Sequence, residues 1–423
     1  MKIKVAKSTI QGKISVPGSK SHTIRALAIA TVADGTSYIR QPLISEDTIA
    51  GMEASKALGA KIIKKDRYWK ITGTNGKAIK NANLINMQNS GTSLRIFTSI
   101  AALGNFSVTF DGDSSLRSRP MSQLTSALRE LGARISDTKG ACPLTVKGPI
   151  QGGKTIVEGT SSQFLTSLLI ALPLAEKESY IKVVNLNEVP YVEMTIDWLC
   201  REGIELEYPE DMSFFKVKGN QSYPAFDITI PADFSTAAFP LVAAAITNSN
   251  LDILHLDFQD YQGDKEVFNY MQKMGTIIQK NNISTSIKSS NKPLTGNVFD
   301  LNATPDALPI MSVAAAFASG KTELINCPQA RIKETDRIKC MTCELRKMGA
   351  NIEELEDGMI ITGSKLHGAE VESYGDHRIA MALTVAGMAA EGETIINGIE
   401  AAAVTYPNFI EDFKKLGANI TEL

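Results

Sequence analysis

The 423-residue chain has few of the features that mark secreted, membrane or nucleic-acid-binding proteins. Its five cysteines are an odd number spread over a long chain, which argues against a disulfide framework. The longest apolar runs, such as 307–318, are too short to cross a bilayer, and the first residues lack the apolar core of a signal peptide. A net charge of -2 argues against a surface built as a whole to attract nucleic acid. We therefore expect a cytoplasmic protein that binds neither membrane nor nucleic acid.

Metal and redox motifs are also scarce. The CxxC pair of Cys340 and Cys343 has no second pair and no spaced histidines to complete a zinc site. It lies in a segment with a helical pattern, so we interpret both cysteines as ordinary thiols.

A repeated sequence pattern is the main feature of the chain. Hydrophobic residues make up 43% of the chain, enough for two or three domains with real cores. About every seventy residues, a polar–apolar segment ends in Leu-Gly, Met-Gly or Glu-Gly and a strand former follows soon after. Each glycine fits the left-handed residue just past a helix end. The marker glycines are Gly59, Gly132, Gly203, Gly275, Gly349 and Gly417.

A second element repeats in step with the first: six segments that are apolar on nearly every helical face. They are 25–33, 95–103, 163–175, 236–246, 307–318 and 378–390. A helix without a polar face must be surrounded by protein. The pattern therefore predicts an α/β chain with layered α+β architecture. We expect two domains of three units, each wrapping sheets and outer helices around three interior helices.

The sequence turns polar where each interior helix begins, at 18–25, 88–95, 159–163, 231–236, 303–307 and 374–378. Serine, threonine, asparagine and aspartate there are ordinary N-caps. Capping does not explain the cations at the same places, which are Lys20, Arg25, Arg95 and Arg378. Cations are unfavourable at a helix N-terminus unless an anion is also present. The pattern therefore predicts that the interior helices of each domain point at a shared cleft that binds highly charged anions.

Two further basic clusters support an anion site. The stretch 115–121 carries Arg117 and Arg119, and the stretch 329–339 carries Lys333 and Arg337, which are four residues apart and share a helix face. A solvated charged surface is the alternative for either cluster. Acids stand among the bases, and the candidates for proton transfer are Asp306, Glu334 and Asp376.

Together the motifs resemble one family. They are KSHTIR (20–25), NSGTSLR (89–95), Arg119-Pro120, SSQ (161–163), Pro305-Asp306-Ala307, RIKETDR (331–337) and DHRIAM (376–381). In this order they resemble the 5-enolpyruvylshikimate-3-phosphate synthase family along the whole chain. That family transfers the enolpyruvyl group of phosphoenolpyruvate to the 5-hydroxyl of shikimate 3-phosphate and releases phosphate, within the shikimate pathway that leads to chorismate and the aromatic amino acids.

The resemblance implies the two-domain enolpyruvyl transferase fold, in which each domain has three βαβαββ repeats around buried helices, an inside-out α/β barrel. It places residues 1–17 and 231–423 in domain I and 18–230 in domain II, with the active site in the cleft between them. It also implies a monomer that acts on two small molecules and needs neither metal nor organic cofactor.

The resemblance also implies roles for single residues. Those for shikimate 3-phosphate are Lys20, Ser21, Arg25, Ser161, Ser162, Gln163, Asp306 and Lys333. Those for phosphoenolpyruvate are Lys20, Asn89, Gly91, Arg119, Gln163, Arg337 and Arg378. Asp306 with Lys20 would serve the attacking hydroxyl, and Glu334 would protonate the methylene carbon.

Some positions depart from the family pattern, and two of them concern phosphate or phosphoenolpyruvate binding. Val404 stands where the family often has a lysine, and Glu188 stands where a serine commonly helps to bind phosphate. We leave Glu188 out of the expected site because a carboxylate there would repel phosphate.

Two alternative functions fit parts of the sequence pattern. A UDP-N-acetylglucosamine enolpyruvyl transferase would share the repeats but lacks the KETDR and DHR runs. A P-loop enzyme is suggested by GPIQGGKT (148–155), which fits GxxxxGK[ST]. The β-branched stretch 155–160 that follows predicts a strand where a P-loop needs a helix.

Overall fold

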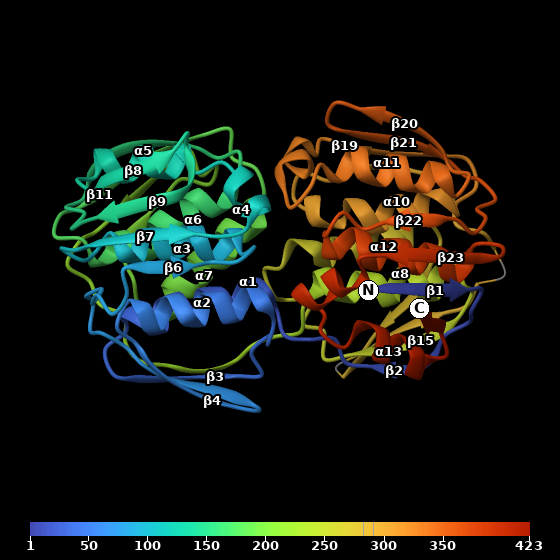
Figure 1. The fold of residues 1–423 in the computed structure, drawn as a ribbon, viewed down its shortest axis with the longest axis horizontal. Coiled ribbons are helices and arrows are strands. Elements are labelled where there is room, and N and C mark those ends of the chain that lie inside the picture. The colour runs from blue at the N-terminus through green and yellow to red at the C-terminus, as the bar shows by residue number, and fades with distance from the viewer. Residues whose placement is uncertain (282, 291) are drawn as a thin grey trace. The chain divides into compact units, whose positions relative to one another are not determined.

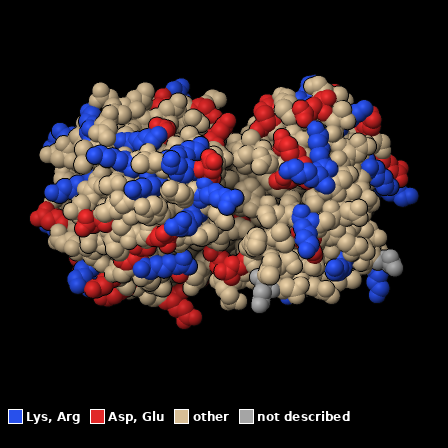
Figure 2. Space-filling model, turned by 90° about the horizontal axis from the view of Figure 1, so that it is seen from below, with Lys and Arg blue, Asp and Glu red and all other residues tan. Residues whose placement is uncertain are grey.

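The computed structural model describes residues 1–281, 283–290 and 292–423. The chain forms two compact units: unit 1 comprises Met1–Pro17 and Pro231–Leu423, and unit 2 comprises Gly18–Ile230. Each unit has its own cluster of buried hydrophobic residues. None of the helices in the described part of the chain is long and apolar enough to cross a membrane. Figure 2 shows both signs of charge interspersed on the viewed face of each unit.

Unit 2 alternates strands and helices along the chain. Its strands are β3 (Thr36–Arg40), β4 (Lys61–Lys65), β5 (Tyr68–Thr72), β6 (Leu84–Asn86), β7 (Ser107–Asp111), β8 (Arg134–Thr138), β9 (Ala141–Lys147), β10 (Gly153–Glu158), β11 (Ser179–Val184), β12 (Leu206–Glu207), β13 (Phe214–Val217) and β14 (Asp227–Thr229). Its helices are α1 (Lys20–Val32), α2 (Glu46–Ala57), α3 (Gly91–Ala101), α4 (Ser114–Ser118), α5 (Ser122–Glu130), α6 (Ser162–Ala171), the 3-10 helix η1 (Leu172–Leu174) and α7 (Val189–Arg201).

Unit 1 alternates in the same way. Its strands are β1 (Lys2–Ala6), β2 (Gln11–Ile14), β15 (Asn250–Leu254), β16 (Ile277–Lys280), β17 (Ser284–Lys288), β18 (Val298–Asp300), β19 (Lys321–Ile325), β20 (Asn351–Leu355), β21 (Gly358–Thr362), β22 (Glu370–Glu372), β23 (Glu393–Asn397) and β24 (Asn419–Glu422). Its helices are α8 (Phe234–Ile246), η2 (Gly263–Lys265), α9 (Glu266–Lys273), η3 (Pro305–Ala307), α10 (Leu308–Ala316), η4 (Pro328–Ile332), α11 (Arg337–Lys347), α12 (His377–Ala389), η5 (Ile399–Val404) and α13 (Phe409–Leu416).

The strands form four-stranded sheets that share one order. In the sheet β6-β7-β9-β8, for example, β6 and β7 are parallel, and β9 lies antiparallel to both β7 and β8. The chain order β6–α3–β7–α5–β8–β9 is the expected βαβαββ repeat, interrupted only by the short α4. Among the described residues, no strand pairing joins these sheets into a closed barrel, so the fold is layered.

The N-terminal segment completes two sheets of unit 1. Strand β1 pairs antiparallel with β23 and β24, and β2 pairs parallel with β15. Figure 1 accordingly shows both chain ends beside each other in unit 1. In unit 2 the late strand β14 pairs parallel with the early strand β3. In three of the sheets, one strand therefore comes from a distant part of the sequence.

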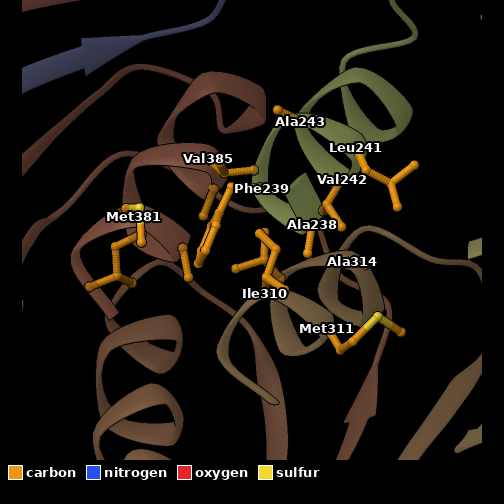
Figure 3. Close-up of a cluster of buried hydrophobic side chains, with 14 of the residues drawn as sticks. Ala238, Phe239, Leu241, Val242, Ala243, Ile310, Met311, Ala314, Met381 and Val385 are labelled. Atoms are coloured by element: carbon orange, nitrogen blue, oxygen red, sulfur yellow. The ribbon is translucent and has the colours of Figure 1, made fainter. Parts of the chain in front are cut away.

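The predicted interior helices form the core of each unit. In unit 2, α3 contacts both α1 and α6, and in unit 1, α8, α10 and α12 contact one another. Figure 3 shows Phe239 of α8, Ile310 of α10 and Val385 of α12 converging in unit 1. Each fully buried side chain of this size contributes about 1.5–3 kcal/mol. This burial on all faces explains why the six segments lack a polar face.

The marker glycines end the outer helices as predicted. All six have positive φ. Gly417, for example, has φ 110° at the C-cap of α13, and its N–H donates to the carbonyls of Phe413 and Lys414. Glycine adopts this left-handed conformation without the penalty that a Cβ imposes.

Candidate functional site

Helix α1 begins with a paired lysine. Lys20 is the first residue of α1, and Ser19 caps the helix by accepting from the His22 N–H. The Lys20 Nζ lies 3.0 Å from Asp47 Oδ2, with 15% and 6% of the two side chains exposed. An anion that binds Lys20 therefore competes with the Asp47 carboxylate for the same charge.

Arg25 lies one turn further along α1 and is 2% exposed. Its guanidinium donates to the Tyr191 carbonyl at 2.8 Å and to the Thr195 hydroxyl at 3.0 Å, both on α7. It also donates to the Thr166 hydroxyl of α6 and to the Ser21 carbonyl. Arg25 therefore fixes the start of α1 to α6 and α7.

The starts of α3 and α6 are linked by arginines. Arg119 donates to the side-chain oxygen of Asn89, and a Cβ on Gly91 would lie 2.8 Å from Arg119 Nη1. Arg95 Nη1 donates to Gln163 Oε1 at 2.5 Å. The structure thus brings together four of the residues predicted for phosphoenolpyruvate, which are Asn89, Gly91, Arg119 and Gln163.

Helix α6 begins with the two predicted serines. Ser161 caps the helix by accepting from the Gln163 N–H. Ser162 donates to Glu188 Oε2 from its hydroxyl at 2.7 Å and from its N–H at 3.2 Å. Glu188 precedes α7 and is 2% exposed, and its carboxylate, which sequence reasoning left out, lies against the first residue of α6.

In unit 1, Asp306 is surrounded by cations. Its Oδ1 lies 2.8 Å from Arg337 Nη1 and 3.7 Å from Lys333 Nζ, and its Oδ2 lies 3.0 Å from Arg378 Nη2. Burial by itself raises the pKa of the Asp306 carboxyl, but Arg378, Lys333 and Arg337 outweigh burial and hold this pKa well below its usual range. The carboxylate is therefore firmly ionised in this arrangement.

Arg337 joins three carboxylates while only 1% of its side chain is exposed. Besides Asp306, it donates to Glu334 Oε2 at 2.6 Å and to Asp376 Oδ2 at 2.8 Å. Asp376 also caps α12 by accepting from the Arg378 N–H. Five of the predicted residues therefore meet in unit 1: Asp306, Lys333, Glu334, Arg337 and Arg378. Val404, at the end of η5, brings no charge.

Asp264 is a further buried acid that the sequence did not single out. It is 1% exposed, accepts from the Ser235 hydroxyl of α8, and has an Oδ1 without a hydrogen-bond partner among the described residues. Burial raises the pKa of Asp264 to about 6, with Arg378 lowering and Asp306 raising it. Its sequence context does not distinguish it from a surface acid.

The P-loop-like stretch and the CxxC pair do not form the sites that their patterns suggest. The stretch 148–155 runs into strand β10, so it lacks the helix that a P-loop requires. Burial raises the pKa of Cys340 to about 11, which makes it an ordinary protonated thiol. Within the described ranges, no three His, Cys, Asp or Glu side chains are grouped to hold a metal ion.

The fold and the charged helix starts place the chain among two-domain enolpyruvyl transferases. Comparison with known proteins narrows this class to one family. Residues 5–413 match the EPSP synthase family, described as 3-phosphoshikimate 1-carboxyvinyltransferase, and the chain belongs to that family. It is therefore an enzyme, and the predicted family and enzyme class are confirmed.

Individual relatives align with this chain over nearly its full length. The chain is 46% identical to the 3-phosphoshikimate 1-carboxyvinyltransferase of Acetivibrio thermocellus, over 100% of this chain and 99% of the relative. It is 45% identical to that of Ruminiclostridium cellulolyticum, over 99% of each. A solved EPSP synthase from Acinetobacter baumannii superimposes with a TM-score of 0.83 at 28% identity, covering 99% of both chains. This similarity confirms the predicted fold class.

Proposed function

We propose that this enzyme transfers the enolpyruvyl group of phosphoenolpyruvate to the 5-hydroxyl of shikimate 3-phosphate and releases phosphate. One observation carries most weight beside the family: an ionised carboxylate, Asp306, lies among three cations and next to a second acid, Glu334, which shares Arg337 with it. This arrangement suits a reaction of anions that needs two proton transfers. We further propose a cytoplasmic monomer that uses no metal or organic cofactor.

We propose one set of binding residues for each substrate. For shikimate 3-phosphate we propose Lys20, Ser21, Arg25, Ser161, Ser162, Gln163, Asp306 and Lys333. For phosphoenolpyruvate we propose Lys20, Asn89, Gly91, Arg119, Gln163, Arg337 and Arg378. Each set includes residues of both units. Cations and helix N-termini offset the repulsion between the two anions.

The low pKa of Asp306 couples proton transfer to binding. A carboxylate held by three cations is a weak base, and substrate anions would draw part of that charge toward themselves. When Arg378 and Lys333 turn to the substrates, the pKa of Asp306 rises and its basicity increases. Asp306 therefore becomes an effective base once both anions are bound.

The reaction then needs two steps. The 5-hydroxyl oxygen bonds to C2 of phosphoenolpyruvate while its proton passes to Asp306, and Glu334 protonates the methylene carbon. In the second step, a proton of the new methyl group returns to Glu334, the C=C bond forms again, and the C–O bond to phosphate breaks with its electron pair leaving on phosphate. Arginines near the leaving group stabilise its charge.

Phosphate release tests the proposal directly. Purified enzyme is mixed with phosphoenolpyruvate and shikimate 3-phosphate, and each substrate is then omitted in turn. We expect phosphate only when both are present. Phosphate release from phosphoenolpyruvate alone, or with UDP-N-acetylglucosamine as the acceptor, would contradict the proposal.

A variant pair tests the role of Asp306. Asp306→Ala is expected to abolish turnover, because it removes the base. Shikimate 3-phosphate should still bind in calorimetry, because the other residues proposed for this substrate remain. Asp66→Ala, at an exposed position between β4 and β5, is the control and keeps full activity. An Asp306→Ala enzyme with a near-normal rate would remove this residue from the mechanism.

A further inference from the structure

Glu188 gives the start of α6 an anion of its own. Its carboxylate accepts from both the N–H and the hydroxyl of Ser162, the first residue of that helix. A carboxylate in this position is stabilised by the helix dipole and by two donors, as a bound anion would be. Ser162 is one of the residues that the proposed function assigns to shikimate 3-phosphate.

The backbone holds Glu188 in this place. Its φ is 56°, in the left-handed region that residues other than glycine adopt rarely. The neighbouring Asn187 N–H donates to the Gly159 carbonyl at 2.9 Å, and the Tyr191 N–H donates to the Glu188 carbonyl at 3.0 Å. The loop is therefore fixed to the segment just before α6. With only 2% of the residue exposed, its position is set by packing and is not that of a surface side chain.

A phosphate that reaches Ser162 meets this negative charge. The carboxylate and the phosphate compete for the same two donors, and their repulsion is strong at a buried position. We propose that Glu188 is a specificity-determining residue that occupies the Ser162 end of the phosphate subsite and weakens binding of the phosphorylated acceptor. The proposal rests on the proposed function, because it takes the acceptor to be shikimate 3-phosphate.

The consequence is specific to the phosphate group. Removing the negative charge of Glu188 favours shikimate 3-phosphate and leaves unphosphorylated shikimate unaffected. It also leaves phosphoenolpyruvate unaffected, because the residues proposed to bind that substrate do not include Ser162. A purely structural role of Glu188 would change the binding of all three ligands together.

Calorimetry on the whole enzyme tests this with two variants. Glu188→Gln keeps the size of the side chain and an oxygen that accepts from Ser162, and Glu188→Ser removes the side chain's bulk. Both are expected to bind shikimate 3-phosphate at least about tenfold more tightly than the native enzyme. Shikimate affinity and the KM for phosphoenolpyruvate should stay within about twofold. Glu193→Gln, further along α7, is the control and should change none of these values.

Each outcome decides the matter. Unchanged or weaker binding of shikimate 3-phosphate by Glu188→Gln would overturn the proposal, and so would an equal gain for shikimate. If Glu188→Ser does not fold by circular dichroism, Glu188→Gln alone decides. The native enzyme is assayed for phosphate release in parallel. Turnover without the predicted tightening defeats this inference only, whereas no turnover by any form defeats the proposed function as well.

Discussion

Replacing Arg337 by methionine should destabilise unit 1 far more than the loss of an ordinary ion pair. Methionine fills much of the same space but leaves Asp306, Glu334 and Asp376 without their shared guanidinium. The three carboxylates differ in how well they tolerate this loss. Asp306 keeps Arg378 and Lys333, and 16% of the Glu334 side chain is exposed to water.

The loss of stability in Arg337→Met therefore depends mainly on Asp376. Its side chain is 0% exposed, and without Arg337 it keeps, among the described residues, hydrogen bonds from the Arg378 N–H and the Thr335 hydroxyl but loses its ion pair. Removing one partner of a buried ion pair costs about 3–5 kcal/mol, because an uncompensated charge remains in the interior. We expect Arg337→Met to lower the free energy of unfolding by that amount.

Urea unfolding provides the assay because the two units can be observed separately. Both tryptophans, Trp69 and Trp198, lie in unit 2, so their fluorescence reports that unit, while circular dichroism reports both. Arg337→Met should shift the circular dichroism transition and leave the fluorescence midpoint in place. The control is Arg40→Met, which breaks a pair with Asp227 that is about half exposed and should cost under about 1 kcal/mol. A loss from Arg337→Met as small as that of the control would refute the reasoning.

Two further predictions concern other parts of the site. Burial raises the pKa of Asp264 from 3.8 to about 6, so as pH falls the folded protein takes up this proton before the unfolded chain does. The free energy of unfolding therefore decreases as pH rises from about 4 to beyond 6. Asp264→Asn should therefore be more stable than the native enzyme at pH 8, by up to about 3 kcal/mol, and lose this advantage near pH 4. A difference in urea midpoints that does not change with pH would contradict the prediction. Gly91→Ala places a Cβ 2.8 Å from Arg119 Nη1, so the KM for phosphoenolpyruvate should rise about tenfold while shikimate 3-phosphate binds as before. An unchanged KM in steady-state kinetics would remove Gly91 from the site.

The repeats were predictable from sequence because their signals are local. A helix that ends at Gly417 or Gly59 needs only a residue that tolerates positive φ, and this is visible in the sequence. The interior helices were visible too, because burial on every side removes polar residues from all faces. Pairing of β1 with β23 has no such local signal, since it joins residues separated by almost the whole chain.

The site was predictable in its charges but not in their partners. Lys20 and Arg337 stand where the resemblance expects them, but their contacts with Asp47 and Asp376 depend on tertiary packing. Glu188 was left out on a sound argument about charge repulsion. The sequence could not show that its backbone adopts a left-handed conformation, or that its carboxylate contacts Ser162.

The central claim is that this enzyme joins two anions by transferring an enolpyruvyl group. Phosphorus NMR of the enzyme with both proposed substrates measures this directly, because each phosphorus atom is followed separately. We predict that phosphoenolpyruvate and shikimate 3-phosphate disappear together, while inorganic phosphate and one new phosphate ester appear in equal amounts. Phosphate that accumulates while the shikimate 3-phosphate signal stays constant would contradict the claim.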